Sequence, residues 1–300
     1  MRRLHRASLA AAAALAFVLP GHAAEPAAPH YSKITVFGQA PQFISLNGRG
    51  LIAGSYVQRI SEDEGQLRGF ARVDRFVDQI TFDNARSVIV TSVNDRGEMV
   101  GLLDRVGSPE ISFVYSSGAL QAISVPNSAT LPALRGINNH GDIVGWVEIN
   151  RDIFGLLIRG GQVTLIDAPQ SGGNSTQAFG VNDARDVVGC YDPAGTIFVS
   201  DGFLWRNGSF TVLRVPNAPV TCALDINNRG TIVGIYSDTA HVQHGFVLRD
   251  GRYTTIDIPD SIQTQVHSIN DAGDIAGLYV SRLARRFAFK SNIAEFIGRD

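Results

Sequence analysis

The chain carries an eight-residue motif that recurs at nearly constant spacing, and this periodicity restricts the folds it can adopt. The motif is clearest at residues 270–277, which read Asn-Asp-Ala-Gly-Asp-Ile-Ala-Gly. Successive copies are 47, 44, 44, 45 and 43 residues apart and begin at Asn47, Asn94, Asn138, Asn182, Asn227 and Asn270. A period of this length indicates a fold built from structurally equivalent units.

Each repeat is predicted to form two β-hairpins. In the fifth repeat, apolar-rich runs at 221–227 and 231–236 flank a tight turn in which Asn227 caps the backbone and Gly230 takes a positive φ. A second hairpin follows at 244–259, around Asp250-Gly251. Equivalent turns lie at 207–208, 160–161 and 117–118, with weaker forms at 74–75 and 291–292.

Four strands in each repeat of about 44 residues are typical of radial β-structures. The sequence therefore predicts an all-β fold, a six-bladed β-propeller of four-stranded antiparallel blades. A linear β-solenoid is the alternative, but its repeats are shorter and contain fewer hairpin turns. A phenylalanine is expected in the third strand of five repeats, at Phe70, Phe113, Phe203, Phe246 and Phe287, whereas the third repeat departs from this pattern at residues 154–156.

The N-terminus has the features of a secretory signal peptide. Arg2, Arg3 and Arg6 precede an apolar run at 7–19, and small residues follow at 20–24. We therefore expect a signal peptide at 1–24, a short linker at 25–32 and one propeller domain at 33–300. The protein is expected to be exported, to the periplasm or the extracellular medium, and to have no membrane anchor.

Both ends of the domain resemble the fourth strand of a repeat. The segments 33–37 and 293–297 give 25 strand candidates for 24 places. One end is expected to complete a blade built mostly from the other, which closes the ring and removes exposed edges. The sequence leaves open which end does so.

Charge and composition exclude some partners. Without the signal peptide, 23 basic residues face 28 acidic ones, and both signs are scattered along the chain. This balance argues against a nucleic-acid or anionic-membrane surface. The one acidic cluster, Glu62-Asp63-Glu64, is interpreted as a solvated loop, and a monomer is expected.

Strand alternation predicts where a binding site lies. The Asn-x-x-Gly turns and the two-residue hairpin turns all fall on one side of the propeller, called here the turn face. The loops between second and third strands and the connections between repeats fall on the other side, the loop face. These segments vary in length and content, as binding loops on a rigid scaffold do. They lie at 61–65, 104–110, 148–152, 192–201, 237–244 and 281–286.

The two cysteines, Cys190 and Cys222, are expected near the loop face in neighbouring repeats. Export permits a disulfide between them, which would stabilise the fold by roughly 3–4 kcal/mol. Two buried free thiols are the alternative. A second local prediction concerns Arg185, which replaces the turn glycine of the other copies and should adopt a positive φ or change the turn.

Five residues are candidates for ligand binding. Arg135 and His267 occupy the position three residues before the motif asparagine, together with Thr91. They would line the channel if the first strand is innermost and they face the axis, but packing between blades is the favoured interpretation. Trp146 ends a second strand near the loop face, where it would stack on a sugar, whereas Trp205 is expected in the core. The other two candidates share the 237–244 loop: His241 and His244.

No cofactor or metal is expected. His241 and His244 lack an acidic or cysteine partner that completes a metal-ligand pattern, and the aspartates of the repeated turns lack EF-hand spacing. His140 is expected to be an exposed turn residue. Nucleophile-elbow, zinc-helix and phosphate-loop motifs do not occur in the sequence.

The repeats resemble the bacterial HAF-type extracellular repeat family. That family is recognised by Asn-x-x-Gly-x-Ile/Val-x-Gly, a His-Ala/Gly-Phe strand and an Ile-Asp-x-Pro ending. Residues 244–246 and 256–259 match best, whereas the other repeats have lost the His and several have lost the Asp. The resemblance covers most of 33–300 and implies a secreted, propeller-like protein, without a common activity or catalytic residues.

Two functions are compatible with these features. The first is a non-enzymatic binding scaffold that takes a carbohydrate or protein ligand on the loop face. The alternative is a hydrolase or lyase that acts on a polymer at the channel mouth, using Arg135, His241, His244 or His267. Convergence of these side chains in one pocket would favour the enzyme, and their dispersal among repeats would favour binding.

Overall fold

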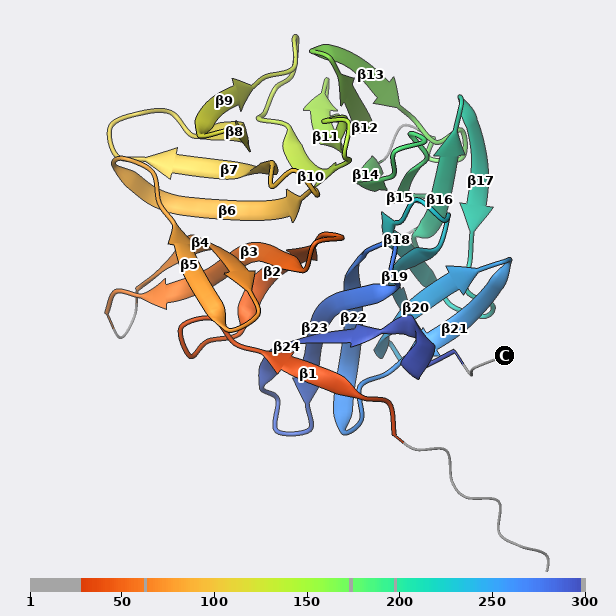
Figure 1. Cartoon of the computed structure of the whole chain (residues 1–300). Helices are drawn as coiled ribbons and strands as arrows, with labels where there is room; N and C mark the ends of the chain where they lie inside the picture. The colour runs from red at the N-terminus through yellow and green to blue at the C-terminus, as the bar shows by residue number, and fades with distance from the viewer. Residues whose placement is uncertain (1–27, 62–63, 173–174, 197–198, 298–300) are drawn as a thin grey trace, which may run out of the picture.

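The computed structural model describes residues 28–61, 64–172, 175–196 and 199–297. The predicted signal peptide, the first part of the predicted linker and two residues of the acidic cluster lie outside the described residues. The described chain forms β-strands and one short 3-10 helix, η1 (Ile293–Glu295). The sheets stand in a ring around a common axis (Figure 1), which confirms an all-β propeller.

The first three repeats contribute strands β2 to β13. The first comprises β2 (Pro41–Leu46), β3 (Leu51–Arg59), β4 (Gly65–Val73) and β5 (Phe76–Ile80). The second comprises β6 (Ala85–Val93), β7 (Met99–Arg105), β8 (Ile111–Ser116) and β9 (Ala119–Ile123). The third comprises β10 (Ala133–Ile137), β11 (Ile143–Ile149), β12 (Asp152–Arg159) and β13 (Gln162–Ile166).

The last three repeats contribute β14 to β24. The fourth comprises β14 (Ser175–Val181), β15 (Val187–Asp192), β16 (Asp201–Arg206) and β17 (Ser209–Leu213). The fifth comprises β18 (Val220–Ile226), β19 (Ile232–Ser237), β20 (Gln243–Arg249) and β21 (Arg252–Ile256). The sixth comprises β22 (Ser261–Ile269), β23 (Asp274–Ser281) and β24 (Arg286–Asn292).

The strands do not form six separate four-stranded sheets as predicted. Four sheets have four strands each, whereas the third and fourth repeats share one eight-stranded sheet. The cause is a parallel pairing of β12 with β14 at Ile153 and Ser175. All other strand pairs within the repeats are antiparallel, as the hairpin pattern predicts.

The N-terminal end closes the ring. Strand β1 (Tyr31–Ile34) pairs antiparallel with β24 and takes the outer position of the last sheet. It begins two residues inside the stretch expected to be linker. The competing C-terminal segment forms η1 instead of a strand, and the weak turn expected at 291–292 is the end of β24.

The core of each repeat is built around the third strand. Four of the predicted phenylalanines are fully buried there, at Phe70, Phe113, Phe203 and Phe246. In the sixth repeat the equivalent residue is Phe289, also 0% exposed, and not Phe287. The prediction failed because the connection into β24 shifts the alignment by two residues. Phe287 is half-buried and carries the Lys33 ammonium 3.3 Å from its ring centroid.

The second glycine of each motif permits this packing. A Cβ on Gly101 would lie 1.8 Å from the carbonyl oxygen of Ile89 on the inner strand and 3.1 Å from the Phe113 ring. Any larger residue would therefore separate the first strand from the second. The glycine allows the buried phenylalanine to fill the space beside it.

Arg185 adopts the predicted left-handed conformation, with φ of 66°. A non-glycine residue in this region is strained by about 1 kcal/mol. Its Nε donates to Asp142 Oδ2 at 2.9 Å, and Asp142 belongs to the preceding repeat. This buried carboxylate gives the Arg185 side chain a role that glycine could not supply.

Candidate functional site

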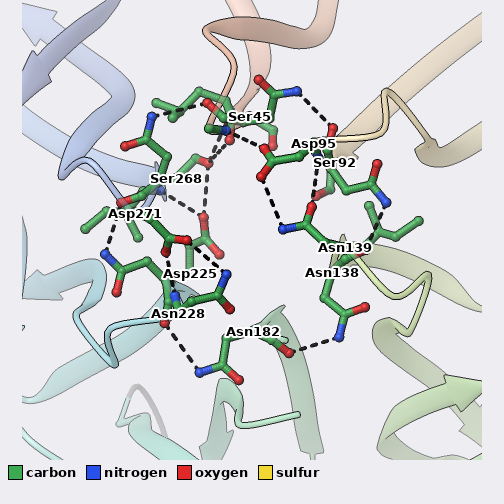
Figure 2. A pocket seen from close by; sticks show the side chains of 18 of the residues that line it. Ser45, Ser92, Asp95, Asn138, Asn139, Asn182, Asp225, Asn228, Ser268 and Asp271 are labelled. Carbon is green, nitrogen blue, oxygen red and sulfur yellow. Dashed lines mark hydrogen bonds between the residues drawn. The ribbon is translucent and has the colours of Figure 1, made fainter. Parts of the chain in front are cut away.

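Six motif asparagines form a closed hydrogen-bonded ring around the axis on the turn face (Figure 2). Each donates its Nδ2 to the main-chain oxygen of the next one, over distances between 2.9 and 3.4 Å. The ring is closed by Asn270, which donates to Asn47. All six side chains are buried: Asn47, Asn94, Asn138, Asn182, Asn227 and Asn270.

The same asparagines also stabilise their own turns. In the fifth repeat, Oδ1 of Asn227 accepts from the backbone N–H groups of Arg229 and Thr231, at 3.1 and 3.0 Å. One amide therefore caps a turn with its oxygen and binds the neighbouring repeat with its nitrogen. The sequence predicts the first role from the turn chemistry, but not the second.

The residue that follows each ring asparagine forms a second set of contacts, outside the ring. Its side chain accepts a hydrogen bond from the backbone N–H of the equivalent residue in the preceding repeat. The backbone N–H of Asn139 is bound by Oδ1 of Asp183 at 2.8 Å, and that of Asp183 by Oδ1 of Asn228 at 2.8 Å. The series ends at Gly48, which has no side chain to offer. These contacts leave few free polar groups at this mouth of the channel.

The axis behind the asparagine ring is narrow and asymmetric. In four repeats the residue two places before the ring asparagine lines the cavity there, which measures about 80 Å³: Ser45, Ser92, Asp225 and Ser268. The third and fourth repeats have Gly136 and Gly180 at this position, and neither lines the cavity. At Gly180 a Cβ would lie 2.7 Å from the Asp225 Cα, so glycine lets the inner strands of the fourth and fifth repeats approach closely.

Asp225 lies in the wall of this axial cavity, which also includes Asp95, Asp183 and Asp271 of the turns. Its Oδ2 accepts from the Ile269 N–H at 2.9 Å and from the Ser268 hydroxyl at 3.0 Å, and its Oδ1 accepts from the Ile226 N–H at 2.9 Å. Burial raises the pKa of Asp225 to about 6, because desolvation outweighs these three hydrogen bonds. The cavity holds a carboxylate that is protonated at mildly acidic pH.

The next layer toward the loop face contains two of the candidate residues. Arg135, His267 and Thr91 line a second axial cavity of about 40 Å³, so the inner strands present this position to the channel. His267 donates from Nε2 to Oε1 of Gln265 at 3.0 Å. Burial, and then the charges of Arg135 and Arg286, lower the pKa of His267 to about 4, so the imidazole is neutral at pH 7.

Arg135 is the least satisfied polar residue of the channel wall. Its Nε is buried without a hydrogen-bond partner among the described residues. Its Cζ lies 4.3 Å from the ring centroid of Trp146 and 5.7 Å from that of Phe43. Trp146 packs in turn against Phe179, with centroids 5.3 Å apart. The ring of the half-buried Trp146 therefore contacts both the Arg135 guanidinium and Phe179.

A cavity of about 350 Å³ opens beside Arg135 on the loop face. Its walls come from the first three repeats and from the connection between the second and third. They are mainly apolar, with Arg135 at the inner end and Glu110 among the lining residues: Phe43, Ile89, Thr91, Gly101, Leu102, Glu110, Thr130, Leu131, Pro132, Ala133, Leu134 and Arg135. Sequence reasoning missed this cavity because its walls come from three repeats.

His241 and His244 lie away from the channel, in the loop and third strand of the fifth repeat. His244 Nδ1 lies 2.9 Å from Asp257 Oδ1 and its Nε2 lies 3.5 Å from Asp238 Oδ2. Its ring stacks on Tyr236 with centroids 4.9 Å apart. His241 takes φ of 61° in the tight turn that Asp238 caps. The histidine of the HAF-like strand is therefore paired with the aspartate of the HAF-like ending.

The fourth repeat carries the same contact with its charges exchanged. Asp201 occupies the position of His244, and Arg214 that of Asp257. The Arg214 guanidinium binds both carboxylate oxygens of Asp201, which is 4% exposed. A contact between these two positions, here an ion pair, thus persists where the HAF-like residues have been lost.

The predicted disulfide is present. Cys190 on β15 and Cys222 on β18 are bonded, with their Cα atoms 4.9 Å apart. The bond links the fourth repeat to the fifth on the loop-face side. Together with the β12–β14 pairing, it ties the third, fourth and fifth repeats to one another.

A further hollow lies at the rim of the turn face. It measures about 890 Å³ and is formed between the fifth and sixth repeats and η1. Arg229, Arg249 and Arg252 line it, together with Asp250 and Asp271. All three guanidinium side chains belong to exposed residues, so water solvates their charge.

The described residues contain no group of three or more His, Cys, Asp or Glu side chains placed to hold a metal ion. In the same part of the chain, no helix has the length and apolar character needed to cross a membrane. Arg135 and His267 come together at the axis, whereas His241 and His244 do not join them. What the site offers is a cationic, partly apolar pocket.

Known proteins resemble this chain in fold and not in sequence. Neither a family model nor a curated protein matches it. Among solved structures, the β-propeller domain of the trilobed protease from Pyrococcus furiosus is 10% identical, with a TM-score of 0.53, over 87% of this chain and 96% of that domain. TolB from Acinetobacter baumannii is 13% identical, with a TM-score of 0.50, over 80% of this chain and 63% of TolB.

A lectin is among the similar structures as well. Aleuria aurantia lectin, solved in complex with Fucalpha1-6GlcNAc, is 10% identical, with a TM-score of 0.50, over 83% of this chain and 91% of the lectin. The chain spans less than two thirds of the length of TolB. At these identities the similarities establish a β-propeller.

Proposed function

We propose that this protein is an exported binding scaffold that takes a carbohydrate or protein ligand on its loop face. The observation that carries the proposal is the 350 Å³ cavity beside Arg135, which is large enough for a small ligand or for one residue or sugar of a larger one. Loops of variable length surround it, as is usual for binding sites on rigid scaffolds.

The opposite mouth of the channel supports this choice of face. There, the six asparagines and the side chains outside them already bind one another. A ligand at that mouth would have to displace bonds that hold neighbouring repeats together. We take the six repeats as six blades, with the eight-stranded sheet as two blades joined by one parallel pair.

The positions of the histidines favour binding over hydrolysis or lysis of a polymer. His267 is neutral and bound to Gln265, and His244 lies between two carboxylates in another repeat. Only Arg135 and His267 share a cavity, and neither is paired with a nucleophile or a carboxylate there. The disulfide supports export, and the motif residues of the repeats are the basis on which we propose membership of the HAF-type family.

The test combines glycan arrays and pull-downs with a loop variant. The loop at 106–110 is shortened to a tight turn, and the paired substitution Arg229→Gln/Arg252→Gln on the turn face serves as the control. We expect the loop variant to lose ligands that the control retains, with both proteins unfolding at similar temperatures. Retention of every ligand by the loop variant would place binding elsewhere. Because a similar propeller is a lectin, glycans are the first ligands to test.

A further inference from the structure

Arg135 is a half-buried residue with a fully buried Nε, and no described residue pairs with its positive charge. Its Nε is buried and unpartnered, and neither an ion pair nor a hydrogen bond of its guanidinium is found within the described parts of the chain. Burial lowers the pKa of Arg135 to about 10, so the group remains protonated at neutral pH. A buried cation without a partner is costly, and proteins normally pair such a charge.

The aromatic contacts of Arg135 do not satisfy its donors. Trp146 and Phe43 attract the cation through their ring faces. A guanidinium presents five N–H groups in its own plane, and ring faces are not their usual acceptors. Trp146 and Phe43 therefore hold the charge in position while N–H groups remain available.

Within the described residues, the neighbours of Arg135 at the axis form no ion pair with it. His267 is neutral and donates its Nε2 proton to Gln265. The Thr91 hydroxyl lies within hydrogen-bonding distance of the Val100 and Leu134 carbonyl oxygens, at 3.1 and 2.9 Å. Asp225, in the same cavity, is occupied by Ser268 and two backbone N–H groups.

The cavity beside Arg135 has room for the missing anion. Its volume of about 350 Å³ lies within the range of small-molecule sites. Its remaining walls are mainly apolar, including Phe43, Ile89, Leu131 and Leu134, and the one acidic residue among them, Glu110, is exposed. Apolar walls with a half-buried cation at the inner end fit a ligand that has one charged group and a partly apolar body.

We propose that Arg135 is the anion-binding residue of this cavity, and that its ligand is a small molecule or terminal group carrying one carboxylate on a partly apolar body. The planar fork of arginine matches a carboxylate in bidentate geometry. A single carboxylate also brings less charge into an apolar cavity than a phosphate does. This inference rests on the proposed function, because it names the ligand class for the same loop-face cavity.

The arginines of the turn face are a weaker anion site. Arg229, Arg249 and Arg252 lie in the larger hollow, but all three are exposed and hydrated. A ligand there would exchange water for a similar interaction, and surface ion pairs contribute about 0–1 kcal/mol. Arg252 therefore supplies a matched control for Arg135.

Calorimetric titration with two pairs of probes tests the inference. Each pair consists of a carboxylate and a neutral analogue: cyclohexanecarboxylate against cyclohexylmethanol, and glucuronate against glucose. We expect at least one carboxylate to bind at least tenfold more tightly than its analogue. Arg135→Gln should weaken that binding at least tenfold, Arg135→Lys less, and Arg252→Gln not at all.

A local readout shows where the probe binds. Trp146 contacts the Arg135 guanidinium, so carboxylate binding should change its fluorescence in a Trp205→Phe background. If Arg135→Gln does not fold, the comparison of charged and neutral probes on the unaltered chain, with Arg135→Lys, still decides the question. Equal binding of both members of each pair, unchanged affinity in Arg135→Gln, or no carboxylate binding up to about 10 mM would overturn the inference.

Different experimental results would contradict the proposed function and the proposed anion site. If array or pull-down ligands survive loop shortening while Arg135→Gln still abolishes carboxylate binding, the proposed function is contradicted and the anion site stands. If the loop variant loses its ligands while Arg135→Gln keeps carboxylate affinity, the anion site alone is contradicted.

Discussion

Asn270 donates its side-chain amide to the main-chain oxygen of Asn47, 3.2 Å away, across 223 positions of the sequence. This hydrogen bond closes the ring of asparagines and joins the last repeat to the first. Both residues are buried, so each unmet donor or acceptor would carry a desolvation penalty. The ring therefore contributes to stability as well as to turn formation.

Substitution of a ring asparagine should separate its two roles. Asn227→Ala removes the donor to Asn270 and the acceptor for two turn N–H groups, and we expect it to lower the free energy of unfolding by about 2–4 kcal/mol. Asn227→Asp keeps the turn acceptor but sets a buried carboxylate oxygen against the main-chain oxygen of Asn270, so it should cost at least as much. Urea unfolding followed by circular dichroism measures both. Asn207→Asp, at an exposed two-residue turn, is the control, with an expected change of at most about 0.5 kcal/mol.

Reduction of the disulfide should destabilise the propeller without unfolding it at room temperature. Cys190 and Cys222 enclose a segment of about 30 residues, and the chain-entropy account gives roughly 3–4 kcal/mol for a loop of this size. We expect dithiothreitol to lower the urea midpoint of the native protein. The double variant Cys190→Ser/Cys222→Ser should have the lower midpoint already and be indifferent to the reductant. A midpoint that does not move on reduction would show that the bond adds nothing to the folded state.

The two shifted groups at the axis should respond to pH in opposite directions. Asp225 has a folded-state pKa of about 6, above its ordinary 3.8, so its contribution is full below about pH 4 and is lost as the pH rises through 6. His267 has a folded-state pKa of about 4, below its ordinary 6.5, so its contribution is full above 6.5 and is lost as the pH falls toward 4. In the native protein the two effects largely cancel.

Single substitutions should reveal each effect. Between pH 7.5 and 4.5, we expect His267→Gln to become more stable than the native protein by about 2 kcal/mol, and Asp225→Asn to become less stable by a similar amount. The double variant should follow the native pH dependence. The measurement is urea unfolding at a series of pH values. Parallel curves for all four proteins would show that neither group titrates abnormally.

The spacing of the inner strands should tolerate glycine where serine stands, but not the reverse. Gly180→Ser would place a Cβ 2.7 Å from the Asp225 Cα, a backbone atom that cannot move alone, and overpacking of this kind costs about 1–3 kcal/mol. Ser92→Gly, at the equivalent place in the second repeat, should cost at most about 1 kcal/mol. Thermal unfolding of the two variants compares them directly, and equal losses would contradict the close approach at Gly180.

Much of the fold follows from local chemistry that the sequence displays. The asparagine spacing predicts the propeller, the replacement of glycine predicts the positive φ of Arg185, and strand direction predicts that Cys190 and Cys222 meet. Each of these depends on one turn or on two adjacent repeats. The prediction of separate four-stranded sheets was wrong for the third and fourth repeats, where Ile153 pairs with Ser175. That contact depends on the loops between repeats.

The site was harder to predict because it depends on the whole ring. The repeat alignment places Arg135 and His267 at one inner-strand position but favours packing between blades there, whereas the structure places both in the channel wall. The absence of an acceptor for Arg135 involves side chains from several repeats, which no local pattern displays. Gly136 and Gly180 were a usable signal that the axis is asymmetric, since serine or aspartate occupies the equivalent position in the other repeats.

Strand β1 gives the closure of the ring a kinetic cost. It completes the last sheet, and the Ser291 hydroxyl binds the main-chain oxygen of His30 across 261 positions. Pairing between the two ends of a chain is slow, because loop closure must precede it. Until it forms, β24 presents an open edge on which another copy could add its own first strand. During folding, pairing of β1 with β24 of the same chain therefore competes with pairing between two copies.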